Sequence, residues 1–192
     1  MDVVDEAKAD PRAEREPAGL VPTVTCAEDL RLLSLEELME LYRQSLAPSS
    51  VRALDGHPKG YGIAPIVMAG GRVDRWLRRY SQSETFVWHG KTLESFSDEQ
   101  GWGWNRFARG PVLAAFPFRS YVGPSKVDHA PTMIFDFDVP KNPWWERFTW
   151  DEVREVCPGV FFGISALRIL GTFHPVAWFA LDANQQTPLV GV

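Results

Sequence analysis

The spacing of apolar positions along the chain changes near residue 84. Between residues 34 and 46, apolar side chains recur at the three- and four-residue intervals that place them on one face of an α-helix. Ser34 followed by Glu37 fits a capping box, in which each side chain satisfies a backbone N–H at the start of a helix. We therefore predict a helix over 34–46. A second apolar stripe predicts another helix over 72–80.

After residue 84, β-branched and aromatic residues dominate short segments bounded by Gly or Pro, which is typical of strands. His89-Gly90 lies between two of them and predicts a hairpin turn, since glycine accepts a positive φ. Few helical patterns separate the segments, which argues against a parallel α/β sheet. About seven or eight strands at this spacing predict a mostly β fold: an antiparallel, lipocalin-like (calycin-type) barrel with one or two N-terminal helices. The segments are 85–88, 91–96, 102–107, 116–122, 132–139, 160–170 and 173–181.

The chain divides into a tail and one domain. Residues 1–20 are charged and lack a sustained apolar period, so we expect a disordered tail. No long linker or repeat interrupts the remainder, and we expect a single barrel domain over 21–192. The segment 56–62 has glycines around Pro58 and predicts a turn; it lacks the Lys-Ser/Thr ending of a phosphate-binding loop.

Aromatic residues are the unusual part of the composition, with 8 Trp and 12 Phe in 192 residues. A barrel of about eight strands can hold one small ligand. Such ligands lie mainly against apolar and aromatic side chains, with a few polar groups that fix their orientation. The composition therefore favours an apolar small-molecule ligand or substrate.

Charge and motif content argue against several other partners. The net charge of −5 and the pI of about 5.4 disfavour nucleic acid. The longest apolar runs are too short to span a bilayer, and the acidic amino terminus lacks the pattern of a signal peptide. Cys26 and Cys157 lack zinc-ligand spacing, the four histidines are dispersed, and no cofactor fingerprint occurs. We expect a cytoplasmic protein without metal or cofactor, and its oligomeric state stays open.

Several segments resemble known bacterial families. The order of helix, glycine turn, helix and Trp88-His89-Gly90-Lys91 resembles an uncharacterised family named for its G-x-W-x-G motif. Here that motif reads Gly56-His57-Pro58-Lys59-Gly60, with Pro58 in place of the Trp. The second half resembles small lipocalin-like β-barrel proteins. Together these resemblances span roughly 34–182 and imply a barrel, without naming a reaction. The segments of the second resemblance are Asn105-Arg106, Tyr121–Ser125, Asp151–Gly163 and Trp178–Asp182.

The strand predicted over 132–139 holds the first catalytic candidates. Alternation puts Asp136 and Asp138 on one face and Phe135 and Phe137 on the other. If the Phe face fills the core, both aspartates lie in solvent. If the Asp face lines a cavity, desolvation and mutual repulsion raise a carboxyl pKa, and either residue could act as a general acid or base.

The charged segment 151–155 holds a second set of candidates. On an extended chain Glu152 and Arg154 share a face, so both could point inward as a pair that positions a ligand, with Glu152 as a catalytic carboxylate. The alternative is an ordinary exposed salt bridge.

A third set lies on two neighbouring segments. Arg106 shares a strand face with Trp102 and Trp104, an arrangement that suits either a structural stack or a holder for a ligand oxyanion. His89 is a further catalytic candidate, and Lys91 a further ligand-binding candidate. Additional candidates for ligand contact are Trp88, Tyr121 and Phe162.

Three functions remain open at this point. The first is binding of an apolar or aromatic small molecule in the barrel. The second is a cofactor-independent cyclase, isomerase or lyase of secondary metabolism, whose barrel-lining carboxylate, Arg and His groups transfer protons or stabilise charge. The third is a structural or partner-binding protein with a filled core. An enclosed space among the aromatic side chains would favour the first two functions over the third.

Overall fold

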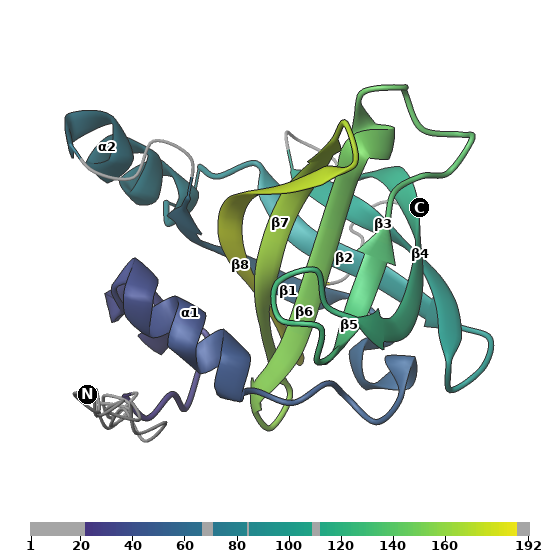
Figure 1. Cartoon of the computed structure of the whole chain (residues 1–192), viewed down its shortest axis with the longest axis horizontal. Coiled ribbons are helices and arrows are strands. Elements are labelled where there is room, and N and C mark those ends of the chain that lie inside the picture. The colour runs from purple at the N-terminus through teal and green to yellow at the C-terminus, as the bar shows by residue number, and fades with distance from the viewer. Residues whose placement is uncertain (1–21, 67–70, 84, 109–111, 188–192) are drawn as a thin grey trace, which may run out of the picture.

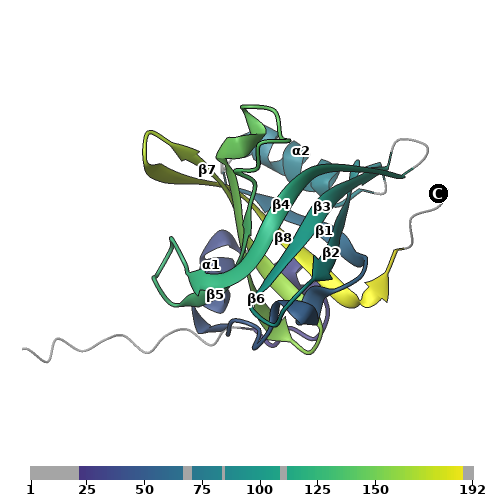
Figure 2. The same cartoon turned by 90° about the vertical axis from the view of Figure 1, so that its right-hand side faces the viewer.

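The strand-forming segments close into a barrel. The computed structural model describes residues 22–66, 71–83, 85–108 and 112–187, and within them eight strands pair in chain order, each antiparallel to the next. The last strand returns to pair with the first, which closes the barrel (Figures 1 and 2). The prediction of a mostly β, antiparallel barrel with N-terminal helices is confirmed. The strands are β1 (Pro58–Pro65), β2 (Trp88–Ser95), β3 (Gln100–Ala108), β4 (Val112–Pro124), β5 (Pro131–Asp136), β6 (Thr149–Cys157), β7 (Val160–Ile169) and β8 (Thr172–Gln186).

Two glycine-containing segments differ from the sequence prediction. Most of the turn predicted over 56–62 belongs to β1. The hairpin predicted at His89-Gly90 is wrong, because β2 runs unbroken through both residues and has a bulge there against β3. Gly90 has a φ of 118°, and a Cβ added to it would lie 2.6 Å from the backbone nitrogen of Gly60. The glycine is therefore needed for the close approach of β1 and β2, which any side chain would separate.

The predicted capping box starts the first α-helix, α1 (Leu35–Gln44). The Glu37 backbone N–H donates to Ser34 Oγ, and the Ser34 backbone N–H donates to Glu37 Oε2. The helix buries Leu38 and Tyr42, two members of the predicted apolar stripe. The second helix, α2 (Gly71–Ser81), also lies where the sequence predicts one.

The helix α1 lies against the outside of the barrel (Figure 1), and hydrophobic side chains form a layer between them. Leu38 and Tyr42 pack there with Phe162 of β7 and Trp178 of β8, whose rings stack with their centroids 4.8 Å apart. Successive side chains of a strand point to opposite faces of the sheet. Because α1 covers the outer face of these strands, that face is as well buried as the inner one, and burial alone does not distinguish them.

A second hydrophobic layer fills one end of the barrel interior. The ring of Phe118 lies 4.9 Å from that of Phe135 and 5.1 Å from that of Phe137, measured between centroids. A short 3-10 helix, η2 (Val51–Leu54), buries its first and last side chains among the same residues. Side chains therefore fill this end of the barrel, and a hollow is left at the other end.

The helix α2 packs beside β1, near that other end (Figure 1). Its last residue, Ser81, approaches β1 at Gly62, where an added Cβ would lie 2.6 Å from the Ser81 carbonyl oxygen. None of the helices in the described part of the chain is long and apolar enough to cross a membrane. The tail predicted over 1–20 lies outside the described residues.

Candidate functional site

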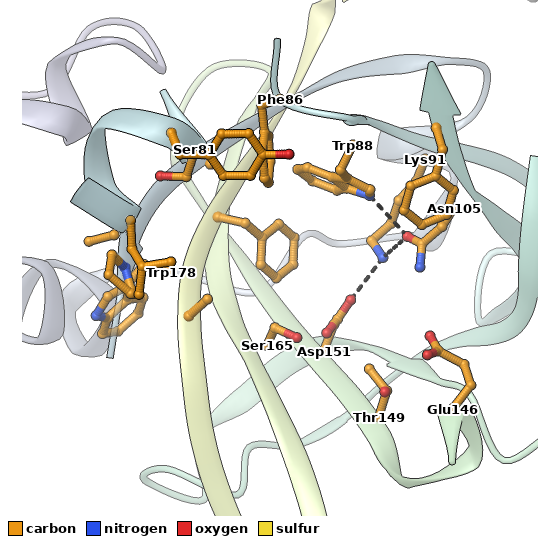
Figure 3. A pocket seen from close by; sticks show the side chains of 18 residues that line it. Ser81, Phe86, Trp88, Lys91, Asn105, Glu146, Thr149, Asp151, Ser165 and Trp178 are labelled. Atoms are coloured by element: carbon orange, nitrogen blue, oxygen red, sulfur yellow. Dashed lines mark hydrogen bonds and ion pairs between the residues drawn. The ribbon is translucent and has the colours of Figure 1, made fainter. Parts of the chain in front are cut away.

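The open end of the barrel interior contains a cavity of about 470 Å³. Its wall is mostly apolar and includes Leu77 and Tyr80 from α2, Phe86 from the segment that follows, Phe107 from β3 and Ala177 from β8. The volume lies within the range of about 300–1,000 Å³ that is usual for small-molecule sites. Figure 3 shows the side chains that line it.

The polar side chains that line this cavity include Lys91, Asn105, Glu146 and Asp151, and we call these four the polar floor. Ser81, Thr149 and Ser165 also line it. Lys91 Nζ donates to Asn105 Oδ1 and to Asp151 Oδ2, each over 2.8 Å (Figure 3). Trp88 Nε1 donates to the same Asn105 oxygen over 3.2 Å. Lys91 is on β2 and Asp151 on β6, which lie on opposite walls of the barrel. The ion pair therefore crosses the barrel interior.

The Lys91 ammonium lies against aromatic rings on its other side. Its Nζ is 4.8 Å from the ring centroid of Phe118, 5.1 Å from that of Phe135 and 4.9 Å from that of Phe137. Rings at such distances attract a cation through their quadrupole. Burial lowers the pKa of Lys91, and the Asp151 carboxylate opposes that shift. Lys91 thus marks the boundary between the packed end of the barrel and the cavity.

Glu146 reaches the polar floor from the 3-10 helix η3 (Glu146–Phe148). It is 8% exposed, and its carboxyl group makes no hydrogen bond or ion pair with any residue that the structure describes. Burial, and secondly the Asp151 carboxylate, raise the pKa of Glu146 from 4.5 to about 7, although Lys91 opposes the shift. A carboxyl group that titrates near neutral pH can both accept and donate a proton.

The polar floor retains hydrogen-bonding capacity that the described residues do not use. Asp151 Oδ1 is buried and has no partner among them. An ammonium group has three N–H donors, and Lys91 directs one each to Asn105 and Asp151. Asn105 accepts through Oδ1, and its Nδ2 amide makes no hydrogen bond with the described residues. Buried polar atoms rarely lack partners, which indicates that a ligand or an ordered water completes this group.

Trp88 and Lys91, both proposed from the sequence, line this cavity. His89 lies between them in β2 but lines a separate hollow beside Lys59 and Tyr61. The bulge in β2 accounts for this separation, since it interrupts the regular alternation of side chains.

Glu152 lies on the outer face of β6, beneath α1, and does not line the cavity. It is fully buried, and its carboxylate accepts hydrogen bonds from Tyr42 Oη (3.0 Å), Ser125 Oγ (2.6 Å), Trp150 Nε1 (2.8 Å) and the Lys126 backbone N–H (2.7 Å). These donors come from α1, the segment after β4 and β6 itself. The carboxylate therefore joins the helix to the barrel.

Arg154 shares this outer face, so the inward-pointing pair with Glu152 does not form. Its guanidinium instead binds both carboxylate oxygens of Asp128, over 2.6 and 2.8 Å, and lies 4.3 Å from the ring centroid of Tyr42. The alternative of an exposed salt bridge is also wrong for Arg154, which is fully buried. Phe162, the cross-strand neighbour of Arg154, lies in the same layer under α1.

Asp136 and Asp138 lie outside the barrel, because the Phe side chains of their segment fill its interior. Asp136 forms ion pairs with Arg119 (2.8 Å) and Arg168 (3.0 Å), which bury it instead of leaving it in solvent. Asp138 follows the end of β5 and pairs with Arg147 over 2.6 Å. The Arg147 guanidinium holds the pKa of Asp138 below its usual value.

The remaining candidates are also outside the cavity. Trp102 and Trp104 line a hollow on the outside of the barrel. Tyr121 packs edge-on against Trp150, with their centroids 6.5 Å apart. Arg106 is fully buried, and its donors are used by backbone carbonyls that join β1, β2 and the end of β8. These carbonyls belong to His57, Pro58, His89, Lys91 and Thr187.

Sequence reasoning missed Asn105, Glu146 and Asp151 as site residues. Asn105 is part of a segment that resembles lipocalin-like proteins, but that resemblance indicates no chemical role for it. Asp151 alternates with Glu152 and Arg154 along the strand, and the hypothesis that Glu152 and Arg154 point inward places Asp151 on the outer face. Glu146 stands among exposed aromatic residues in an irregular segment, where no periodicity indicates a direction.

Comparisons with known proteins add one structural likeness. No family model and no curated protein matches the sequence. Among solved structures, the chain is similar to a protein from Thermomonospora curvata, with 17% identity and a TM-score of 0.48. The match covers 82% of this chain and 99% of that one. The resemblance to G-x-W-x-G-type and lipocalin-like proteins stays a prediction.

Proposed function

We propose that this protein binds a small, neutral, mainly apolar molecule in the barrel cavity, with one polar group of the ligand on the polar floor. The observation that carries the proposal is a buried carboxylate oxygen, Asp151 Oδ1, which lacks a partner among the described residues and belongs to a side chain lining an apolar cavity of about 470 Å³. An O–H or N–H donor, from the ligand or from a water bound beside it, would satisfy that oxygen.

The charges of the polar floor favour a neutral ligand over an anion. Its cation, Lys91, is already paired with Asp151, and Glu146 adds a second carboxyl group. A ligand carboxylate would have to leave water for a site that holds two acidic groups and one paired cation. Desolvation of a charge is costly unless a partner compensates it.

The cavity also favours binding over the alternative of a structural protein with a filled core. Aromatic side chains fill the end of the barrel near η2, whereas the end near α2 keeps a space of ligand size. A closed eight-stranded barrel is compatible with such a space.

Titration with N-phenyl-1-naphthylamine tests the proposal, because this neutral apolar dye gains fluorescence when it leaves water. We expect saturable binding with one site per chain. Ala177→Phe, which places a ring in the cavity, should weaken binding at least about tenfold. Ala114→Phe is the matched control, because Ala114 is exposed on β4 and lines none of the hollows described above. Absence of saturable binding, or equal affinities of the two variants, would refute the proposal.

A further inference from the structure

Glu146 is the residue of the cavity whose chemistry extends beyond binding. Its carboxyl group lines the cavity without a hydrogen-bond partner in the described residues, whereas Asp151 is held by Lys91 over 2.8 Å. Figure 3 shows Glu146 on the side of the cavity where Asn105 and Asp151 lie. An unpaired carboxyl group that lines the same cavity as free N–H donors can act as a general base on a substrate held by those donors.

We propose that the cavity catalyses proton transfer at the carbon next to the carbonyl group of an apolar ketone, with Glu146 as the base and with Lys91 and Asn105 as donors to the carbonyl oxygen. This inference rests on the proposed function, because the ketone must first occupy the cavity. It assigns the polar group of the substrate to a carbonyl, which accepts from Lys91 and Asn105, and it gives Glu146 a catalytic role. Because a ketone has no O–H or N–H donor, Asp151 Oδ1 then accepts from an ordered water.

The donors for the carbonyl oxygen are the groups left free by the hydrogen bonds of the polar floor. The ammonium of Lys91 has one N–H that neither Asn105 nor Asp151 accepts, and Asn105 has its Nδ2 amide. Lys91 and Asn105 are direct cross-strand partners in β2 and β3, so both side chains leave the sheet on the same face. Donors fixed in this way stabilise negative charge that develops on an oxygen.

The reaction needs no other reactant. The Glu146 carboxylate takes a proton from the carbon next to the carbonyl. The C–H electron pair then forms a carbon–carbon double bond, and the π pair of the carbonyl moves to the oxygen held by Lys91 and Asn105. Protonated Glu146 returns the proton to the same carbon or, where the substrate has an adjacent double bond, to the far end of that system. The second outcome moves the double bond, so the net reaction is an isomerisation.

A covalent role for Lys91 is less consistent with the geometry. A Schiff base forms from the neutral amine, and the nitrogen would have to leave its carboxylate partner at 2.8 Å and its neighbouring rings. Asp151 is therefore a positioning residue for the Lys91 cation in this proposal.

The exchange of hydrogen for deuterium at C2 of 1-tetralone, followed by NMR in D₂O, tests the proposal. We expect exchange faster than in buffer alone. Glu146→Gln should lower the enzymatic rate at least about 100-fold, because general acid–base catalysis contributes at least that much. It should leave the affinity for 1-tetralone, measured by displacement of N-phenyl-1-naphthylamine, unchanged within about twofold. Glu94→Gln is the matched control, because Glu94 is exposed on β2.

The outcomes separate this proposal from the proposed function. Displacement of the dye by 1-tetralone without exchange above the buffer rate overturns the catalytic role and leaves binding intact. Dye binding without displacement by 1-tetralone overturns the assignment of a ketone. Equal exchange by the wild type and Glu146→Gln overturns the role of Glu146. A mass increase after borohydride reduction, located on Lys91, overturns the non-covalent mechanism. Absence of dye binding refutes the proposed function itself.

Discussion

Lys91 of β2 and Asp151 of β6 meet across the barrel interior, with 2.8 Å between ammonium nitrogen and carboxylate oxygen. Both side chains are at least nine-tenths buried. On one side the pair contacts the phenylalanines that fill the end near η2, and on the other it lines the cavity. It therefore sets how deep a ligand can enter and which chemical group the ligand meets there.

The Lys91–Asp151 pair should behave as a unit in unfolding experiments. Lys91→Met leaves Asp151 buried without a cation, and loss of one partner of a buried pair costs about 3–5 kcal/mol. The double variant Lys91→Met/Asp151→Leu removes both charges, and we expect it to be more stable than either single variant. Urea unfolding of the four proteins measures this coupling. Additive effects of the two substitutions would show that the pair is not coupled.

The raised pKa of Glu146 predicts how stability depends on pH. The folded protein holds this proton up to a pH of about 7, whereas the unfolded chain releases it near 4.5. The contribution to stability is thus present below pH 4.5 and is lost as the pH rises to about 7, by an amount of up to about 3 kcal/mol.

Glu146→Gln removes this titration, so its stability relative to the wild type should increase between pH 4.5 and 7. Thermal unfolding of both proteins across this range measures the difference. Because the other titrating groups are shared, they cancel in the comparison. Parallel curves would contradict the raised pKa.

The outer carboxylate Glu152 should matter for stability and not for ligand binding. Glu152→Gln places an amide where the carboxylate accepts from Tyr42, Ser125 and other donors, and we expect a loss of about 2–4 kcal/mol in unfolding free energy. The affinity for N-phenyl-1-naphthylamine should not change, since Glu152 lies behind the sheet. Glu99→Gln, at an exposed position, is the control. A loss of affinity in folded Glu152→Gln would place this carboxylate in the binding site.

The sequence predicted the local features of the fold better than the directions of its side chains. The capping box of Ser34 and Glu37 forms as predicted because both partners lie within one turn of helix. The segment around Phe135 was also recognised as a strand. At Gly90, by contrast, the local preference for a turn gave way to the close packing of β1 against β2.

Which face of a strand points into the barrel depends on which face α1 covers. The sequence of a single strand does not show this. The alternation of β6 gives two faces, one with Trp150 and Glu152 and one with Asp151. The alternation alone does not show which face points inward, and the structure settles it by placing Tyr42 of α1 against Glu152. For the same reason the Lys91–Asp151 pair, which joins residues 60 positions apart, could not be predicted from either residue's neighbours.

The indole N–H signals of ¹⁵N-labelled protein provide the most direct test of where a ligand binds. Trp88 donates to Asn105 at the polar floor, whereas Trp102 lines the hollow on the outside of the barrel. We predict that saturating N-phenyl-1-naphthylamine shifts the indole signal of Trp88, assigned through Trp88→Phe, and leaves that of Trp102 in place. A shift of the Trp102 signal with that of Trp88 unchanged would contradict a binding site inside the barrel.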